Sequence, residues 1–539
     1  MPFADWIAAN ARRTPERIAL RFGPQQISWR ALAGHCDRIA AALAAAGVAR
    51  GDCVSWLGLN SPSMLAMLFA CARQGLVFMP LNWRLAPPEH HAVLADVAPA
   101  LLCADAGFAT TLANPTQVAR RVALGAAPAG WARWDDFLAG VERPVAPPPR
   151  ASSTASAAGT DPAAPLLLCF TSGSTGRPKG VLLSADALAA NADASVDMHA
   201  LRADDRVLTT LPLFHVGGLN ILTTPALRCG CTVTLHERFD ADATFDAIER
   251  ERITLTVLVP AQLEAMVQHP RWPRADLSSL RMITSGSTQV PLRLIRAVHT
   301  RGVPLVQVWG ATETAPIAAA LHAGDAMRKP GSSGRAARGC ELRVVDFQGR
   351  PVAPGESGEV LVRGRMVMSD YWRDPAATGI ALAGGWYHSG DSGHFDREGF
   401  LYIDGRLKDM IISGGENISP AEVEAVLLDS PEIAEAAVVG RPDARWGEAV
   451  VAVIAPAPGA RPSRESVLAL FEGRLARFKH PKEVHLVDAL PRTALGKVRK
   501  EAVRELVAGS TALAPAPSPT PSPAPSPTLS ATPREERAA

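Results

Sequence analysis

A ten-residue segment rich in glycine and hydroxyl side chains lies between two short apolar runs. Thr171–Gly180 contains three glycines, four hydroxyl side chains and one lysine. The flanking runs, 166–170 and 181–183, are too short for helices, so we predict two buried strands. A glycine turn between strands brings backbone N–H groups close to a ligand, and hydroxyls beside a lysine suit a polyphosphate. The segment therefore predicts a phosphate-binding hairpin, with a flexible surface turn as the alternative.

This hairpin is not the common P-loop, whose pattern is G-x-x-x-x-G-K-[ST]. Gly173 and Gly176 lie too close together, Pro178 precedes Lys179, and Gly180 stands where Ser or Thr belongs. A P-loop also opens a helix, whereas a strand-like run follows here. The chain must hold its phosphate in another way.

Length and composition limit the class of protein. A chain of 539 residues is too long for one simple core, so we expect two or more domains. With 47% hydrophobic and 20% charged residues it is an ordinary globular chain, and its net charge of +2 gives no case for binding nucleic acid.

The eight cysteines are scattered, and Cys229–Cys231 is the one close pair, without a second pair or His cluster to complete a zinc site. We expect buried free thiols in a reducing cytoplasm. The N-terminus has no signal-peptide pattern. The apolar stretch 64–80 is broken by Arg73, Gln74 and Gly75, so we expect no integral membrane segment.

Helix-like and strand-like segments alternate in the first part of the chain. We predict a helix over 29–46, a strand over 53–58, a helix over 62–73 and a strand over 76–79. Such alternation predicts an α/β fold with a mostly parallel sheet covered on both faces. A second run of this kind over 205–300 suggests two α/β sheet subdomains.

The second half changes character. Short β-type stretches over 331–403 predict a small β-barrel. A compact α+β unit of about a hundred residues follows, with a helix predicted over 464–475 and a final strand over 483–486. We expect an N-terminal domain over 1–405, a hinge at 406–409, a mobile C-terminal domain over 410–507 and a disordered Pro/Ser/Ala-rich tail over 508–539. The Pro/Ala-rich stretch 143–165 is a linker inside the first domain.

Two further segments carry polar chemistry. In 308–314, Thr312 and Glu313 follow a strand and a glycine; a carboxylate beside a phosphate site is a natural Mg²⁺ ligand, although the pair could instead cap a helix. In 387–393, Gly-Asp-Ser-Gly imitates the nucleophile segment of trypsin-like proteases. That interpretation needs a secreted, disulfide-bonded β-protein, which the composition excludes.

Taken together, these segments resemble the adenylate-forming superfamily, which includes acyl-CoA synthetases, luciferases and peptide-synthetase adenylation domains. Six motifs occur in the order of the family, and the resemblance covers roughly residues 5–505. It implies the superfamily's fold: a large N-terminal lobe followed by a small mobile domain.

The resemblance assigns roles in nucleotide binding. It places the ATP phosphates on the 171–180 loop, Mg²⁺ on Glu313, the ribose on Asp391, and the ribose and α-phosphate on Arg406. Trp309, where Tyr is usual, would stack on adenine, and Ser287 and Thr288 depart from the usual Gly-Ala of the adenine-side loop. The full set of nucleotide-binding residues implied is Thr171, Ser172, Gly173, Ser174, Thr175, Gly176, Lys179, Gly286, Ser287, Trp309, Gly310, Thr312, Asp391, Arg406 and Lys497.

The C-terminal part of the resemblance concerns the second substrate and the domain motion. Lys497, within 491–500, would bring its ammonium to the reacting carboxylate and α-phosphate; otherwise it lies in a solvated basic turn. Lys408 occupies the hinge position. The loop of Ser413, Gly414 and Gly415 would line the pantetheine tunnel of coenzyme A, and is otherwise only a turn.

The residue at position 215 indicates which class of acid the chain would activate. Amino-acid-activating members carry an Asp here that pairs with the α-ammonium, whereas ligases of acids without that amine carry His. A buried His satisfied by a backbone carbonyl is the equal alternative. With Thr171, Glu313 and Lys497, His215 completes the catalytic group that the resemblance implies.

These inferences predict an AMP-forming acid–thiol ligase that uses ATP, Mg²⁺ and coenzyme A. An acid would react to acyl-AMP and pyrophosphate, and CoA would then displace AMP. A fatty acid of medium or long chain, or another apolar monocarboxylate, is the main expectation. Alternatives are an aryl-CoA ligase of benzoate, cinnamate or succinylbenzoate type, an adenylation enzyme loading a carrier protein, a luciferase-like oxygenase and a non-catalytic nucleotide-binding protein. The oligomeric state stays open, with a homodimer as one option.

Overall fold

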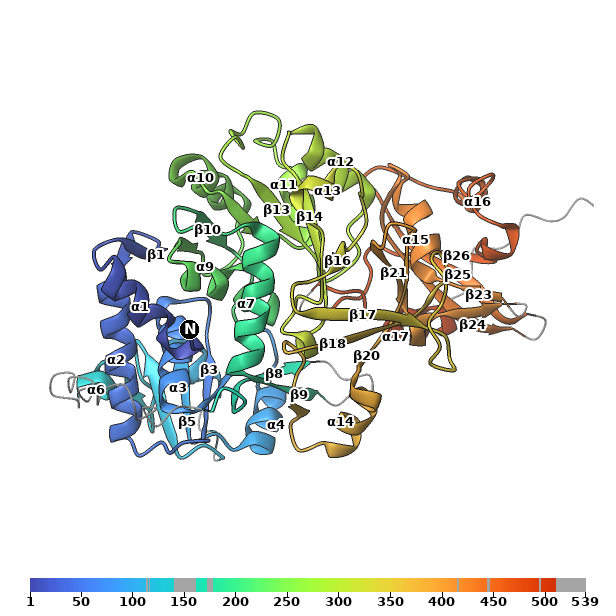
Figure 1. Cartoon of the computed structure of the whole chain (residues 1–539). Helices are drawn as coiled ribbons and strands as arrows, with labels where there is room; N and C mark the ends of the chain where they lie inside the picture. The colour runs from blue at the N-terminus through green and yellow to red at the C-terminus, as the bar shows by residue number, and fades with distance from the viewer. Residues whose placement is uncertain are drawn as a thin grey trace, which may run out of the picture.

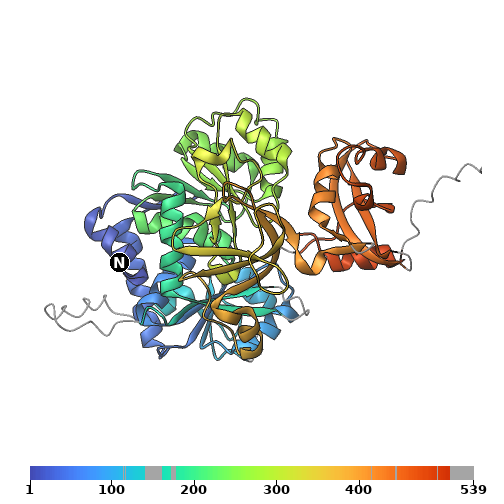
Figure 2. The same ribbon diagram turned by 45° about the vertical axis from the view of Figure 1, so that its right-hand side comes forward.

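The structure is a computed structural model, and it describes residues 1–112, 115, 117–139, 161–171, 178–413, 416–443, 446–493 and 496–509. A large lobe contains three sheets and the helices around them, and a smaller C-terminal unit stands beside it (Figures 1 and 2). The linker predicted at 143–165 lies outside the described residues up to Thr160, and the tail lies outside them from Ser510.

The first sheet is built mainly from the N-terminal third of the chain. Its strand order is β19-β9-β8-β4-β3-β5-β6-β7, in which β3 pairs in parallel with β4 and β5, and β9 runs antiparallel between β8 and β19. The strands are β3 (Cys53–Leu57), β4 (Val77–Pro80), β5 (Leu101–Asp105), β6 (Arg120–Leu124), β7 (Ala132–Arg133), β8 (Pro165–Thr171), β9 (Lys179–Ser184) and β19 (Asp370–Tyr371). The two predicted strands around the glycine-rich segment are thus β8 and β9.

Helices connect and cover these strands. They are α2 (Trp29–Ala45), α3 (Pro62–Gln74), α4 (Pro87–Val97), α5 (Ala106–Leu112) and α6 (Trp134–Ala139). Helix α3 begins where the Ser61 side chain accepts from the Met64 N–H, with Pro62 in the first turn, and ends at Gly75 with φ +69°. These are ordinary start and stop signals, which is why the sequence predicted this helix closely.

The second sheet has the order β16-β15-β14-β13-β12-β10-β11-β1-β2. The strands are β1 (Ile18–Phe22), β2 (Gln25–Ser28), β10 (Arg206–Thr209), β11 (Thr232–Leu235), β12 (Leu255–Val257), β13 (Met282–Ser285), β14 (Leu305–Trp309), β15 (Ala319–Ala320) and β16 (Arg335–Ala336). The helices of this subdomain are α1 (Trp6–Arg13), α7 (Ala185–His199), α8 (Val216–Gly218), α9 (Thr224–Cys229), α10 (Ala241–Glu251), α11 (Pro260–Val267), α12 (Leu292–Thr300) and α13 (Ala323–Ala326), with a π-helix, η2, over Leu219–Thr223.

The two subdomains share one hydrophobic core. It includes side chains of both sheets and the fully buried Trp6, Trp29 and Trp56. Helix α7 runs through this core, and its Asn191 donates to the backbone oxygen of Asn220 at 2.7 Å and accepts from the Ile317 N–H at 3.0 Å. Continuous burial of this kind makes the large lobe one rigid platform.

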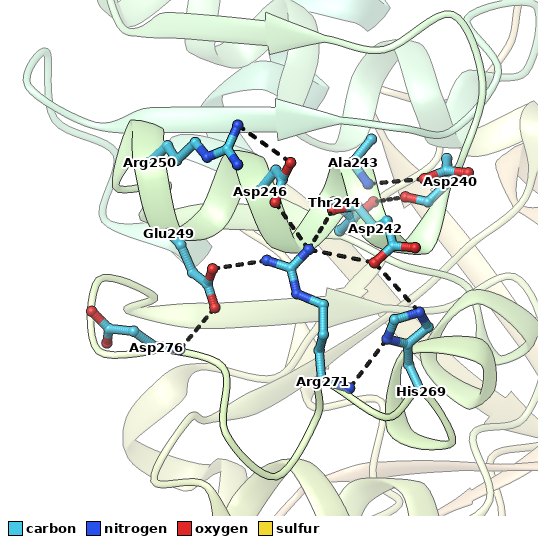
Figure 3. A network of polar contacts seen from close by, with 10 residues as sticks. All are labelled: Asp240, Asp242, Ala243, Thr244, Asp246, Glu249, Arg250, His269, Arg271 and Asp276. Atoms are coloured by element: carbon cyan, nitrogen blue, oxygen red, sulfur yellow. Dashed lines mark hydrogen bonds and ion pairs between the residues drawn. The ribbon is translucent and has the colours of Figure 1, made fainter.

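A surface network stabilises the outer edge of the second subdomain (Figure 3). The guanidinium of Arg271 reaches three carboxylates of α10: Asp246 at 2.9 Å, Glu249 at 2.8 Å and Asp242 at 3.4 Å. Its carbon lies 5.2 Å from the centre of the buried Phe245 ring. The network ties α10 to the loop after α11, which lies away from the predicted site.

The region 331–403 forms an antiparallel sheet of four strands, with β17 and β21 at its two edges. The sequence predicted a small barrel in this region. In the structure, its strands pair in the order β17-β18-β20-β21. The strands are β17 (Cys340–Val345), β18 (Gly358–Gly364), β20 (Tyr387–Phe395) and β21 (Leu401–Arg406), with α14 (Pro375–Ala381) before β20.

The C-terminal unit has its own core on both faces of a separate sheet. Its strands are β22 (Ile411–Ser413), β23 (Glu416–Ile418), β24 (Ile433–Asp443), β25 (Gly447–Pro456) and β26 (Glu483–Leu486). Its helices are α15 (Pro420–Leu428), α16 (Arg464–Ala469) and α17 (Lys500–Gly509). Helix α16 is shorter than the predicted 464–475, and α17, which the sequence did not predict, runs two residues past the predicted domain end.

The structure confirms the prediction about the cysteines: all eight are free thiols and six are buried. Among the described residues, no cluster of His, Cys, Asp or Glu could hold a metal by itself. The same residues include no helix with both the length and the apolar character needed to cross a bilayer.

His199, at the end of α7, should make stability depend on pH. It is fully buried, its Nδ1–H donates to the Ser195 carbonyl at 2.9 Å, and its Nε2 accepts from the Thr284 hydroxyl at 2.9 Å. Burial lowers the pKa of His199 from 6.5 to about 4. The unfolded chain therefore takes up a proton between these values while the folded chain does not, so stability falls as pH drops through this window, by about 3 kcal/mol.

The measurement is the thermal unfolding midpoint at pH 7.5, 6 and 5. The His199→Gln variant should be less stable at pH 7.5 but lose less stability on acidification than the wild type. Equal acid sensitivity in both proteins would contradict this role of His199.

Candidate functional site

The predicted magnesium ligand lies at the junction of the two sheets. Glu313 belongs to a short 3₁₀ helix, η3 (Thr312–Thr314), that follows β14, and its side chain is buried. The Tyr371 hydroxyl donates to Glu313 Oε1 at 2.7 Å, and the Met368 N–H donates to the Glu313 carbonyl at 2.7 Å. These contacts fix the carboxylate between β14 of one sheet and β19 of the other.

Lys179 reaches the same place from β9. Its ammonium lies 4.9 Å from the centre of the Tyr371 ring, a cation–π contact, because β9 pairs with β19. Thr171 pairs with Lys179 across the β8–β9 hairpin, and its hydroxyl donates to the Lys179 carbonyl at 3.4 Å. Ser172, Gly173, Ser174, Thr175 and Gly176 lie outside the described residues, so their predicted phosphate contacts remain predictions.

A second carboxylate, Asp391, lies on β20 and is 8% exposed. Its Oδ2 accepts from the indole Nε1–H of Trp309 at 2.8 Å, and its Oδ1 lies 2.8 Å from Arg406 Nε. Arg406 is the direct partner of Asp391 in the β20–β21 pairing. Burial raises the pKa of Asp391, and the positive charge of Arg406 opposes that rise.

Lys497 brings the C-terminal unit to this group. A turn closed by the Gly496 N–H, which donates to the Thr493 carbonyl at 2.8 Å, presents the lysine. Burial is the main cause that lowers the pKa of Lys497; Arg406 lowers it further, and Asp391 and Glu313 oppose the decrease. The charges of three predicted site residues of the large lobe therefore act on the Lys497 ammonium.

His215 caps the short helix α8, and its Nδ1 accepts from the Gly217 N–H at 3.0 Å. Its ring proton must therefore be on Nε2, which is a donor. Burial lowers the pKa of His215 from 6.5 to about 4, helped by the charges of Lys497 and Arg84. The ring is neutral at physiological pH and lies within electrostatic range of Lys497. A backbone carbonyl partner, the alternative raised by the sequence, is not found among the described residues.

The predicted adenine-side loop lies against the strand that carries Trp309. A Cβ at Gly286 would approach the Val308 carbonyl oxygen to 2.6 Å, and one at Gly310 would approach the Pro316 carbonyl oxygen to 1.9 Å. Only glycine fits at these two positions. Ser287 has φ +76°, a conformation that glycine adopts without strain, so the usual glycine here has a backbone reason.

The predicted hinge residue, Lys408, forms an ion pair with the last helix and not with this group. Lys408 pairs with Glu501 of α17 at 3.1 Å, and the neighbouring Asp409 pairs with Arg504 at 2.8 Å. Ser413 is buried at the end of β22, and Gly414 and Gly415 lie outside the described residues. The residues of the predicted hinge thus directly follow β21 and are tied to the last helix.

Sequence reasoning missed two tyrosines. Tyr371 holds Glu313, and the pKa of the buried Tyr387 is raised by burial and by the charge of Glu313, so it also lies near the site. The chain has three tyrosines in all, and two of them lie here, a scarcity that could have drawn attention to them.

The residues present fit a Mg²⁺ ion that would take one ligand from the protein, Glu313, and further ligands from the phosphates of the nucleotide. Glu313 is a buried carboxylate whose Oε1 takes the Tyr371 proton, while Oε2 accepts no hydrogen bond from the part of the chain that the structure describes. Magnesium takes one or two carboxylates together with substrate phosphates and water, so no complete protein cage is required.

Comparisons with known proteins agree with this geometry. The AMP-binding enzyme model matches residues 7–372, and the model of the AMP-binding enzyme C-terminal domain matches 422–497. An "Indoleacetate–CoA ligase" of Aromatoleum aromaticum is 57% identical over 518 residues, which are 95% of this chain and 99% of that protein. A "Feruloyl-CoA synthase" of an Amycolatopsis species is 41% identical over 93% of this chain and 98% of its own.

Among solved structures, o-succinylbenzoate CoA synthetase from Bacillus subtilis, in complex with its acyl-adenylate intermediate, matches with a TM-score of 0.82. Its sequence identity is 30%, and the match covers 95% of this chain and 99% of that chain.

This chain belongs to the AMP-binding enzymes of the adenylate-forming superfamily, as its motifs indicated. Its two-lobe fold is the superfamily fold. It is an AMP-forming acid–thiol ligase that acts on a small carboxylic acid with ATP and coenzyme A.

Proposed function

We propose that the acid is aromatic and that an arylacetate such as indole-3-acetate is the preferred substrate. The observation that carries this proposal is the 57% identity, over nearly the full length of both chains, to a protein named as an indoleacetate–CoA ligase. The sequence alone favoured a fatty acid and kept an aryl-CoA ligase as the alternative. The comparisons support the alternative better, since the relatives that are 57% and 41% identical are named for aromatic acids, whereas two relatives named for fatty acids are 35% and 34% identical.

A small pocket lies between β10, β12 and the α8–η2 segment, with Leu208, Leu211, Leu222, Val257 and Thr210 among its lining residues. Gly217, whose N–H binds His215, also lines it. Its volume is only about 10 Å³, room for about one water molecule. The uncharged body of the acid would lie against this partly aliphatic lining, with its carboxylate toward His215.

The roles of the polar residues in the first half-reaction follow from their positions. The acid carboxylate attacks the α-phosphorus of ATP, pyrophosphate leaves, and acyl-AMP forms. Negative charge builds on the α-phosphate oxygens, where the Lys497 ammonium and the Arg406 guanidinium stabilise it. The neutral His215 donates from Nε2 toward the substrate carboxylate and orients it for in-line attack.

The remaining residues hold the nucleotide. Glu313, oriented by Tyr371, would hold Mg²⁺, which neutralises the pyrophosphate leaving group when bound. Thr171 and Lys179 face the phosphates from the β8–β9 hairpin, Thr312 faces the α-phosphate, and Asp391 accepts from the ribose hydroxyls.

The second half-reaction needs a different arrangement of the C-terminal domain. The CoA sulfur attacks the acyl carbon and AMP leaves, with the 413–415 loop lining the approach. The Lys497 ammonium lies within range of the charges of Glu313, Asp391 and Arg406, so we propose that the domain rotates about Lys408 to bring that loop in. We propose the same domain boundaries as the sequence predicted.

The test is a panel of acids in which pyrophosphate release and acyl-CoA formation are both measured. Indole-3-acetate and phenylacetate should exceed octanoate and palmitate in kcat/KM by at least about tenfold, since pocket shape discriminates by that order. Product must appear as the CoA thioester with AMP. A fatty acid as the best substrate would refute the proposed acid and restore the original expectation.

A further inference from the structure

The carboxylate of Asp391 is held by two side chains from separate parts of the large lobe, one through a hydrogen bond and one through an ion pair. Trp309, at the end of β14, donates its indole N–H to Oδ2 at 2.8 Å. Arg406, at the end of β21, lies with Nε 2.8 Å from Oδ1. Among the described residues, Oδ2 thus accepts one hydrogen bond and Oδ1 is paired with one cation, and the plane of the carboxylate is set by both.

The ring of Trp309 is itself held in place. Its side chain packs against two small clusters of the antiparallel sheet, one with Val344, Val360 and Leu401 and the other with Val362 and Tyr387. An indole that cannot turn aims its N–H in one direction, so it can orient the carboxylate that accepts from it.

A carboxylate oxygen can accept two hydrogen bonds. Trp309 fills one position on Oδ2, and the charge of Arg406 lies beside Oδ1, so each oxygen keeps at least one position for a further donor. Two acceptor positions side by side match the adjacent 2′ and 3′ hydroxyls of a ribose, which both donate. Without the indole N–H, the carboxylate could rotate about its own bond and lose this match.

We propose that Trp309 is a positioning residue for the ribose, and that its indole N–H, acting through Asp391, makes the enzyme prefer ribonucleotides to deoxyribonucleotides. The inference rests on the proposed role of Asp391 at the ribose and extends it to a residue whose expected role was stacking on adenine alone.

The two functions of the indole can be separated chemically. The predicted stacking on adenine would use a face of the ring, whereas the N–H at the ring edge is used by Asp391. Phenylalanine keeps an aromatic face and removes the N–H; leucine removes both. Burial raises the pKa of Asp391 and the Trp309 hydrogen bond opposes that rise, so the N–H also helps to keep the acceptor ionised.

The experiment measures binding of AMP and of 2′-deoxy-AMP to the full chain by isothermal titration calorimetry, which requires no acid substrate. The wild type should prefer AMP. Trp309→Phe should reduce that preference by about tenfold, the effect of one hydrogen bond to a charged group. Trp309→Leu should reduce the preference equally while weakening the binding of both nucleotides. Thermal unfolding confirms that each variant is folded.

Asp391→Asn separates the failure of this inference from the failure of the proposed ribose site. If Asp391→Asn abolishes the preference but Trp309→Phe and Trp309→Leu leave it at the wild-type value, the positioning role of Trp309 is wrong and the ribose site stands. If Asp391→Asn leaves the preference unchanged, Asp391 does not bind the ribose, and both proposals fail together.

Discussion

Replacing Lys497 by alanine should lower the rate of acid-dependent pyrophosphate release by about 10²–10³-fold, the usual effect of removing one group that stabilises transition-state charge. The ammonium lies within electrostatic range of Glu313, Asp391 and Arg406, the residues proposed to hold the nucleotide. Formation of the thioester from supplied acyl-adenylate should change by only a few-fold, because the C-terminal domain has then rotated and Lys497 has left the site.

The matched control is Arg499→Ala. Arg499 is an exposed cation two residues along the same segment, so its loss removes the same charge from the domain without affecting the site. It should leave both half-reactions near wild type. An equal loss of both half-reactions in Lys497→Ala would refute the division of labour between two domain positions.

The pH dependence gives a second measure of the same residue. The pKa of Lys497 is lowered, mainly by burial, so its stabilising charge should be lost at a pH below the ordinary 10.5 of a lysine. Pyrophosphate release should therefore decline on the alkaline side earlier than thioester formation does. On the acid side, the low pKa of His215, about 4, keeps this ring neutral in the weakly acidic range.

Replacing Glu313 by glutamine should reduce pyrophosphate release by about 10²–10³-fold, since an amide keeps the shape but loses the charge that holds Mg²⁺. The Mg²⁺ concentration for half-maximal nucleotide binding, measured by calorimetry with ATP and no acid, should rise in parallel. This second measurement separates loss of the metal from loss of chemistry.

Tyr371→Phe is the companion variant. It removes the hydroxyl that donates to Glu313 but keeps the ring beneath the Lys179 ammonium. We expect the affinity for Mg²⁺ to fall by about tenfold, as is typical when a hydrogen bond to a metal ligand is lost. If Glu313→Gln left the Mg²⁺ requirement unchanged, the metal would have to be held elsewhere, and the role of Tyr371 would fall with it.

Much of the fold could be predicted because local rules govern it. Helix α3 has a serine cap, a proline in its first turn and a glycine at its end, and the predicted bounds differ by one residue. Strand β26 was predicted to the residue. Helix α16 was predicted too long, because an amphipathic pattern continues past Ala469 although the helix stops there. Helix α17 was missed because it begins at Lys500, the last residue of the motif that drew attention to Lys497.

The site was predictable only in part. The residue types within the motifs pointed to four charged residues: Glu313, Asp391, Arg406 and Lys497. The structure brings these four together. Tyr371 could not be selected, because it acts on Glu313 through a single hydrogen bond across 58 residues of chain. The choice between fatty and aromatic acid was equally beyond the sequence pattern, since it depends on the shape of a cavity.

By itself, the sequence determined the superfamily, the two-lobe fold and most of the charged residues of the candidate site. Glycine turns, apolar periods and motif side chains are local properties of a chain, which is why they could be recognised without the structure. Only the tertiary structure decided how those residues are oriented: Trp309 against Asp391, Tyr371 against Glu313, and Lys497 on the far domain beside both carboxylates. The physical reason is that a hydrogen bond or a pKa depends on distances and burial, and segments remote in sequence set both only once the core has packed.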